Sequence, residues 1–280
     1  MSEPIRSRPI VGIVIPTVDN SFFSSLSAAA SRFLFSAGCT PLILSSANDA
    51  ETEKEHLRSL AGMGARGILC VSGLSSWPED LLPEDLPLVW VDRRPATDRP
   101  IPFIANDDGI AMAEATEYLI EKGCRDILLM PGYLAENRIS PRVVGYEEAL
   151  RKHGITPNPA YILYRPGRGP SETETEELVR RAMAQGIRAD AVITSSDRAA
   201  FGVIAALHRV GLYVPDDVKL ISFDNSPYST MASPAVTALD RKPQLLAETA
   251  CRSLLDQMAG KPVQMETMIP VSLIRRDSTR

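Results

Sequence analysis

Short apolar segments alternate with segments of helix length along the whole chain. In the first half the apolar segments, which we interpret as strands, are Ile10–Pro16, Pro41–Ser45, Gly67–Val71, Leu88–Asp92 and Phe103–Ala105. The segments between them predict helices over residues 21–37, 50–62 and 109–122. Strands of continuous apolar character that alternate with helices are typical of a parallel sheet covered on both faces. The first half therefore predicts a doubly wound α/β unit.

The second half repeats this alternation. Its predicted strands are Asp126–Met130, Tyr161–Tyr164, Ala191–Thr194, Lys219–Phe223 and Val236–Leu239. Its predicted helices cover residues 141–153, 171–185, 198–210 and 243–259, and glycines stand where several of the helices should end. About five strands per half is the ordinary size of one sheet, so the chain is expected to form two α/β lobes.

Composition limits the partners that this chain can bind. Thirty basic and 35 acidic residues give a net charge of −5, the opposite of the basic surface that binds nucleic-acid phosphates. The chain by itself is therefore not expected to bind DNA. Four cysteines without C-x-x-C spacing predict buried side chains in a reducing compartment. Because neither a signal peptide nor a membrane-spanning stretch is recognisable, we expect a cytoplasmic protein with no membrane partner.

Motifs for catalysis or cofactor binding are weak. The G-x-G-x-x-G of residues 62–67 follows a predicted helix and precedes a strand, the reverse of the order that binds a dinucleotide. The loop 167–170 offers an anion site or, more simply, a surface loop. The three histidines, at positions 56, 153 and 208, lie in predicted helices and are expected to face solvent. We predict no enzyme activity, no cofactor and no metal site.

Polar and aromatic residues cluster where predicted strands end. Phe22 and Phe23 follow the first strand, Asp92 and Arg93 follow the fourth, and Asp224 follows a strand of the second half. Open α/β sheets bind ligands at the carboxyl ends of their strands. Aromatic faces, carboxylates and guanidinium groups together are typical of a site for a small polar ligand. The alternatives are a place in the core for the phenylalanines and a turn for Asp92.

Several segments resemble the effector-binding core of the lac repressor family of transcription regulators. The resemblance extends from Pro9 to Thr279 and rests on Val11–Pro16 followed by Asn20–Phe23, on Arg142–Tyr146, on Thr194–Asp197, on Gly211–Val218, on Ile221–Asn225 and on Ile274–Thr279.

The resemblance implies two lobes of the periplasmic-binding-protein-like type I fold, joined by three crossover strands, with a small effector in the cleft. By that analogy the first lobe covers residues 9–122 and 243–261, and the second covers 123–240 and 264–280. It adds Arg142, Ser196, Asp197 and Arg241 to the expected ligand-binding residues.

Departures from the family pattern affect the expected ligand. Ser196 stands where the family usually has asparagine, Arg241 where glutamine is frequent, and Asp107-Asp108 where Asp-Asn is usual. A sugar or sugar derivative is the expected effector, and a ligand with a carboxylate or phosphate group is an alternative to an ordinary hexose.

The resemblance also implies a complete regulator. By the resemblance, family members carry a helix-turn-helix of roughly sixty residues before this core. We expect the chain to be a fragment whose DNA-binding domain lies upstream, and the alternative is a gene that has lost this domain. We expect a homodimer formed by the helices around 50–62, 198–210 and 228–233, because Leu57, Leu60 and Met63, like Phe201, Ile204 and Leu207, form apolar faces.

The predicted function is effector sensing and dimerisation, with operator DNA as the partner of the full-length protein. A solute-binding receptor of a sugar transport system is the alternative.

Overall fold

The computed structural model describes residues 8–133, 140–167 and 171–280, which divide into two compact units. Unit 1 comprises the described residues up to Asn106 together with Lys242–Ile269, and unit 2 comprises Asp107–Arg241 and Pro270–Arg280. The chain passes from one unit to the other three times. The first passage precedes α3 (Asp108–Glu121), whereas the family resemblance placed this helix in the first lobe. α3 belongs to unit 2 because it packs along α4 (Pro141–Lys152).

Unit 1 contains a six-stranded parallel sheet in the order β11-β5-β4-β3-β1-β2. Its strands are β1 (Ile10–Ile15), β2 (Thr40–Ser45), β3 (Gly67–Cys70), β4 (Leu88–Val91), β5 (Phe103–Asn106) and β11 (Glu266–Ile269). The helices α1 (Ser21–Ser36) and α8 (Pro243–Met258) share an apolar core with one face of the sheet. The helix α2 (Ala50–Gly62) and the segment 74–82 cover the other face.

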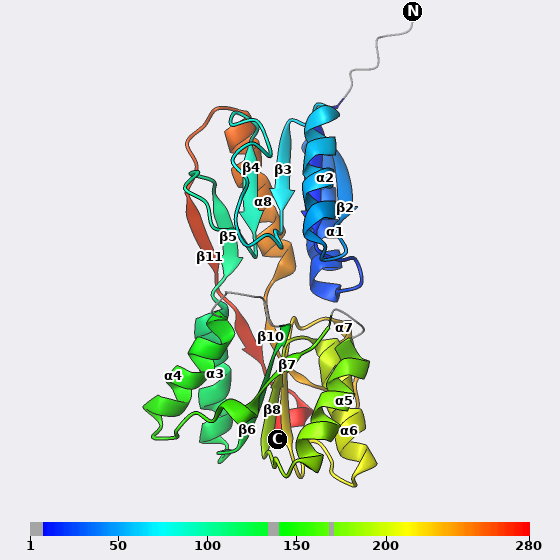
Figure 1. Cartoon of the computed structure of the whole chain (residues 1–280), viewed down its shortest axis with the longest axis vertical. Helices are drawn as coiled ribbons and strands as arrows, with labels where there is room; N and C mark the ends of the chain where they lie inside the picture. Colours follow the sequence, from blue (N-terminus) through cyan, green and yellow to red (C-terminus); the bar gives the residue numbers. More distant parts are fainter. Residues whose placement is uncertain (1–7, 134–139, 168–170) are drawn as a thin grey trace, which may run out of the picture. The chain divides into compact units, whose positions relative to one another are not determined.

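Unit 2 repeats this topology in the order β12-β10-β9-β8-β6-β7. Its strands are β6 (Ile127–Tyr133), β7 (Ile162–Arg165), β8 (Ala191–Thr194), β9 (Lys219–Phe223), β10 (Thr237–Asp240) and β12 (Ser272–Ile274), of which β12 alone runs antiparallel to its neighbour. The helices α3 and α4 pack together on one side, and α5 (Ser171–Ala184) and α6 (Asp197–Arg209) pack together on the other (Figure 1).

Two close contacts between helices in unit 2 require glycine. A Cβ atom on Gly145 would lie 2.0 Å from the carbonyl oxygen of Gly109 in α3, and a Cβ atom on Gly202 would lie 2.2 Å from the carbonyl oxygen of Glu172 in α5. Both obstacles are backbone atoms, which cannot move aside as a side chain can. The glycine of the Arg142–Tyr146 motif is therefore explained by the packing of α3 against α4.

The structure confirms the predicted alternation of strands and helices, with element ends shifted by at most a few residues. Among the described residues, seven glycines that follow helices have positive φ angles. All four cysteines are free and buried, as the sequence predicted. The prediction missed β11 and β12, whereas the helix expected around residues 228–233 is present as the short helix α7 (Pro227–Met231). The sequence did not predict β11 and β12, because these edge strands contain exposed or partly exposed residues and lack a continuous apolar run.

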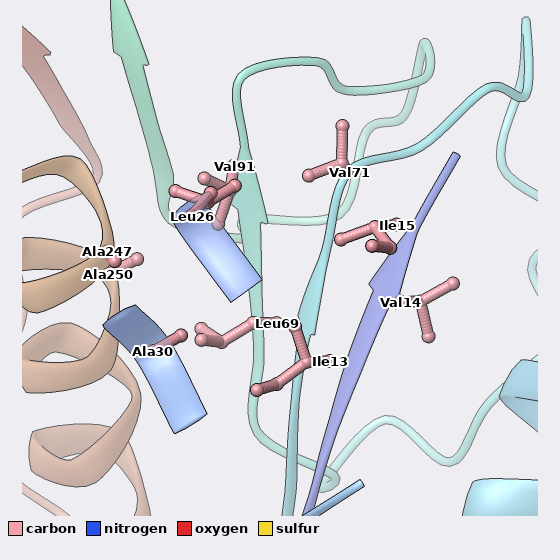
Figure 2. Close-up of a pocket in the computed structure, with 10 residues that line it drawn as sticks. All are labelled: Ile13, Val14, Ile15, Leu26, Ala30, Leu69, Val71, Val91, Ala247 and Ala250. Atoms are coloured by element: carbon pink, nitrogen blue, oxygen red, sulfur yellow. The ribbon is translucent and has the colours of Figure 1, made fainter. Parts of the chain in front are cut away.

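A small cavity of about 10 Å³ lies in the apolar core of unit 1 (Figure 2). Its lining comes from β1, β3 and β4, from Val71, and from α1 and α8, and it consists of Ile13, Val14, Ile15, Leu26, Ala30, Leu69, Val71, Val91, Ala247 and Ala250. A space of this size and apolar lining offers no hydrogen-bond partners. It is a packing gap and not the expected effector site.

Among the described residues, no helix combines the length and the apolar character that crossing a bilayer requires.

Candidate functional site

A pair of opposite charges lies at the start of two helices of unit 2. Arg142 is the second residue of α4, after Pro141, and Asp108 is the first residue of α3. The Nε and Nη2 atoms of Arg142 lie 2.9 Å and 2.8 Å from Oδ2 of Asp108. Nη1 donates to the carbonyl oxygen of Ser195 at 3.3 Å, and the guanidinium carbon lies 3.9 Å from the ring centroid of Phe223. Arg142 is thus held in one orientation by three partners at the carboxyl end of the sheet.

A second guanidinium group faces the same carboxylate. Arg241 directly follows β10 and is only 4 % exposed. Its Nε atom lies 3.5 Å from Oδ1 of Asp108, and its Nη1 atom lies 3.8 Å from Oδ1 of Asp224. Asp108 therefore places one oxygen against each guanidinium. We call these four residues, Asp108, Arg142, Asp224 and Arg241, the charge cluster.

The two carboxyl groups of the charge cluster differ in their pKa values. Burial raises the pKa of Asp224 to about 7, although Arg241 opposes the shift and the negative charge of Asp197 adds to it. Burial also acts against ionisation of Asp108, but Arg142 and Arg241 outweigh it and hold the pKa of Asp108 below its ordinary value. Asp108 is consequently ionised at neutral pH, whereas Asp224 changes its protonation state near neutral pH.

Ser196 and Asp197 fix the backbone next to the charge cluster. Ser196 caps α6, because its hydroxyl oxygen accepts a hydrogen bond from the backbone N–H of Ala199 at 3.3 Å. Asp197 is 1 % exposed and accepts hydrogen bonds from the Ser222 hydroxyl at 2.5 Å and the Ser226 backbone N–H at 2.6 Å. Burial raises the pKa of Asp197, and these hydrogen bonds oppose the rise. Asp197 therefore holds both ends of the turn that carries Asp224.

The aromatic residues after β1 have different surroundings. Asn20 caps α1 by accepting hydrogen bonds from the backbone N–H groups of Phe22 and Phe23. Phe22 is 2 % exposed and belongs to the core of unit 1, which is the alternative stated above for it. Phe23 is partly buried, and the guanidinium carbon of Arg93 lies 5.3 Å from its ring centroid. Of the two rings, only that of Phe23 combines partial exposure with a polar neighbour.

Asp92 and Arg93 lie at the carboxyl end of β4 in unit 1. Asp92 has a φ angle of 64°, and its backbone N–H donates to the carbonyl oxygen of Ile104 at 2.9 Å. The Nε atom of Arg93 lies 3.6 Å from Oδ2 of Asp92, and the Arg93 side chain is 37 % exposed. The turn expected as the alternative for Asp92 is present, with the carboxylate directed to its neighbour.

Sequence reasoning missed two residues with buried or partly buried carboxylates. Asp108 was recognised as a departure from the family pattern but was not included among the expected ligand-binding residues. It lies just after the carboxyl end of β5, where open α/β sheets bind their ligands, so this signal could have identified it. Glu53 in α2 carries no such signal. It accepts hydrogen bonds from the Ser72 hydroxyl at 2.6 Å and the Gly73 backbone N–H at 2.7 Å, and burial raises its pKa. Glu53 was missed because the sequence does not reveal a helical carboxylate that points at a loop.

The remaining candidates do not form a catalytic arrangement. His153 and His208 are exposed as predicted, whereas His56 is partly buried beside the Ser45 carbonyl oxygen. Residues 62–67 run from the end of α2 into β3, as predicted. Positions 168–170 of the loop 167–170 lie outside the described residues. Among the residues that the structure describes, no group of three or more acidic, histidine or cysteine side chains is placed to hold a metal ion.

Comparison with known proteins gives a consistent family assignment. Residues 116–279 match the family model described as a periplasmic binding protein-like domain. The chain is 29 % identical to the HTH-type transcriptional repressor PurR of Yersinia pestis, over 99 % of this chain and 82 % of that protein. It is 25 % identical to the ribose operon repressor of Halalkalibacterium halodurans, over 98 % of this chain and 81 % of that protein.

A solved structure has the same fold. It is that of a periplasmic binding protein/LacI transcriptional regulator from Alkaliphilus metalliredigens, complexed with D-xylulofuranose. The match has a TM-score of 0.84 at 24 % identity and covers 97 % of this chain and 99 % of the other.

Proposed function

This chain belongs to the lac repressor family and forms the effector-binding domain of a transcription regulator, and from that premise we propose that the charge cluster of unit 2 binds the effector. The effector is a small polar molecule, a sugar or sugar derivative. The observation that carries this proposal is the fixed pair of Arg142 and Asp108. A guanidinium group donates paired hydrogen bonds and a carboxylate accepts them, which is the chemistry that recognises the hydroxyl groups of a sugar.

The ligand class also has support from the relatives. One relative is named for a ribose operon, and one structural neighbour was solved with D-xylulofuranose. Arg93, with its guanidinium over the Phe23 ring, is the corresponding candidate in unit 1 for a polar contact beside an aromatic face. Ser196 and Asp197 contribute by holding the turn that carries Asp224.

The effector acts on DNA binding by shifting a conformational equilibrium. A ligand changes this equilibrium only when it binds one state more tightly than the other. We propose a cytoplasmic regulator without catalytic activity, cofactor or membrane partner, with operator DNA as the partner of the full-length protein. With a net charge of −5, the 280-residue chain itself gives no sequence-specific gel shift. A shift with sequence preference at physiological salt would contradict this.

The protein is a homodimer in this proposal. Leu57, Leu60 and Leu207 of the expected apolar faces are buried within their own units, so they support packing and not an interface. Met63 after α2, Tyr213 after α6, and Tyr228 and Met231 of α7 remain exposed and are the candidates for the dimer contact. Sedimentation should show a dimer at micromolar concentration, and Met231→Glu with Tyr228→Glu should weaken it. A monomer would contradict the proposal.

The effector site is tested by calorimetry after a thermal-shift screen of sugars, sugar acids and sugar phosphates. Arg142→Ala should weaken binding of the best ligand by about 1.5–3 kcal/mol, because it removes hydrogen bonds from a charged group. The matched control is Arg151→Ala in the same helix, whose exposed side chain pairs with Glu147 and should leave binding unchanged. Equal affinity in Arg142→Ala and the unchanged protein would remove Arg142 from the site.

A further inference from the structure

We infer that Arg276 is a positioning residue of the effector site, which holds the turn that carries Asp224 in the conformation that binds the effector. We call residues 224–226 the Asp224 turn and residues 275–280 the tail. This inference rests on the proposed function. It assigns a role to the segment Ile274–Thr279, on which the family resemblance partly rests and which the site described above does not use.

The backbone of the Asp224 turn needs support from its surroundings. Asp224 and Asn225 have φ angles of 95° and 53°, so two successive residues with a Cβ atom lie in the left-handed region. Aspartate and asparagine adopt this region more readily than most residues, but it remains costly and persists where neighbouring groups hold it. The contacts of the turn therefore decide where the carboxyl group of Asp224 lies.

Three partners hold the three residues of the turn. The backbone N–H of Asp224 donates to the adjacent strand β10 at 3.0 Å. Asp197, at the start of α6, accepts a hydrogen bond from the backbone N–H of Ser226 at 2.6 Å. Arg276, in the tail, donates from Nη2 to Oδ1 of Asn225 at 2.5 Å. The tail thus holds the middle residue of the turn through a side chain.

The guanidinium group of Arg276 is itself fixed. Its Nη1 atom donates to the carbonyl oxygen of Val236 at 2.7 Å and to the hydroxyl oxygen of Ser229 at 3.3 Å. The backbone N–H of Arg276 donates to the hydroxyl oxygen of Thr237 at 2.8 Å. A planar guanidinium group with acceptors at both Nη atoms has little freedom to rotate. Arg276 therefore ties the Asp224 turn to the start of β10 and to α7.

Buried hydroxyl groups anchor the rest of the tail. Ser278 donates from its hydroxyl group to the carbonyl oxygen of Leu220 at 2.5 Å and accepts from the backbone N–H of Thr237 at 2.8 Å. The hydroxyl oxygens of Thr279 and Thr237 lie 2.7 Å apart. Ser278 and Thr279 are 0 % and 1 % exposed. These residues fix the tail to β9 and β10, whereas Arg276 reaches the turn beside the charge cluster.

Loss of the Arg276 side chain should weaken effector binding without any direct contact between Arg276 and the effector. Binding groups need to lie within about 0.5 Å of their productive positions. A turn that has lost its central hydrogen bond samples other conformations, and the effector would have to order it again on binding. The expected consequence is a lower affinity in a protein that still folds.

The first measurement is hydrogen–deuterium exchange of the 280-residue chain without ligand, read on the peptide that covers the Asp224 turn. Arg276→Met keeps an apolar stem and removes the donors and the charge, and exchange in the turn should become about tenfold faster. Arg275→Met is the matched control, because the exposed guanidinium group of Arg275 lies over the Tyr118 ring and should leave the turn unchanged. Unchanged exchange in the turn of Arg276→Met would overturn the inference.

The second measurement is calorimetry with D-ribose, D-xylulose, D-gluconate and ribose 5-phosphate as probes. Arg276→Met should bind the tightest of these probes about tenfold more weakly, and Arg276→Lys, which keeps the charge and a donor, should recover part of the loss. Val179→Ala in α5 truncates a side chain that is 2 % exposed and lowers the melting temperature. An equal loss of affinity in Val179→Ala would trace the effect to stability alone and overturn the inference.

A double-mutant cycle asks whether Arg276 acts through the turn. Asn225→Gly removes the acceptor and still permits the positive φ angle. It should weaken binding about as much as Arg276→Met does, and the variant with both changes should bind no more weakly than either one alone. Additive losses would show that Arg276 acts elsewhere and would also overturn the inference.

The outcomes distinguish this inference from the proposed function. Faster exchange in the turn of Arg276→Met, with unchanged affinity for a probe that Arg142→Ala weakens, would overturn the inference and leave the effector site intact. Unchanged affinity in Arg142→Ala, or no binding by any probe, would count against the proposed function. The exchange measurement, which needs no ligand, would then still decide whether Arg276 holds the turn.

Discussion

The same turn occurs in both units and is used in different ways. Asp92 follows β4 and Asp224 follows β9, each the fourth strand of its unit along the chain. Both aspartates have positive φ angles, 64° and 95°, and both donate their backbone N–H to the adjacent strand, to Ile104 and to Leu239. The equivalent positions thus share backbone geometry and residue type.

The partners of the two aspartates differ in exposure and origin. Asp92 pairs at 3.6 Å with Arg93, its neighbour in sequence, whose side chain is 37 % exposed. Asp224 faces Arg241, with 3.8 Å between its Oδ1 atom and Nη1 of Arg241. Arg241 follows the next strand, its side chain is 5 % exposed, and it also contacts Asp108. The partly exposed guanidinium of Arg93 can adapt to a ligand, whereas the buried network around Arg241 fixes its geometry in advance. We therefore expect unit 2 to contribute most of the ligand specificity.

The largest expected effect comes from removing one charge from each network. Asp108→Asn leaves Arg142 and Arg241 without their shared carboxylate, and because Asp108 is partly exposed we expect a loss of about 2–4 kcal/mol in the free energy of unfolding. Asp92→Asn, next to the more exposed Arg93, should cost less than about 1 kcal/mol. Urea denaturation measures both. Similar losses in the two variants would contradict the view that the network of unit 2 is the stronger one.

A smaller effect should appear in the pH dependence of stability. The pKa of Asp224 is about 7 in the folded protein and lies near its ordinary value of 3.8 when unfolded, so the folded state binds the extra proton between these limits. Stability relative to Asp224→Asn is therefore present at low pH and is lost as pH rises toward 7. We expect a relative loss of about 2–3 kcal/mol between pH 5 and pH 8. Parallel stability curves for the protein and Asp224→Asn would mean that Asp224 is ionised throughout this range.

The smallest effect is expected at Arg93. Arg93→Gln removes an exposed charge over the Phe23 ring, and the free energy of unfolding should fall by about 0.5–1 kcal/mol. The measurement is again urea denaturation, with Arg151→Gln as an exposed-charge control. A loss above about 2 kcal/mol would show that Arg93 belongs to a network that stabilises unit 1 as strongly as the charge cluster stabilises unit 2.

The sequence could predict the fold to a large extent because buried parallel strands and their helices produce a strong pattern. The edge strands β11 and β12 lack it, since their residues are partly exposed. In the site, the strand-end rule identified Asp92 and Asp224, and the family resemblance identified Arg142 and Arg241. Neither could show that Asp108 lies between two arginines, because this contact depends on how α3, α4 and β10 pack. Phe22 illustrates the converse, since an aromatic residue at a strand end also serves the core.

The most direct measurement of the central claim is a crystal structure of this chain with the tightest ligand from the thermal-shift screen of sugars, sugar acids and sugar phosphates. The account predicts ligand oxygens within about 3.2 Å of the guanidinium nitrogens of Arg142 and Arg241, with a ligand hydroxyl donating to Asp108. A ligand bound elsewhere, with the contacts between Asp108 and the two arginines unchanged, would contradict it.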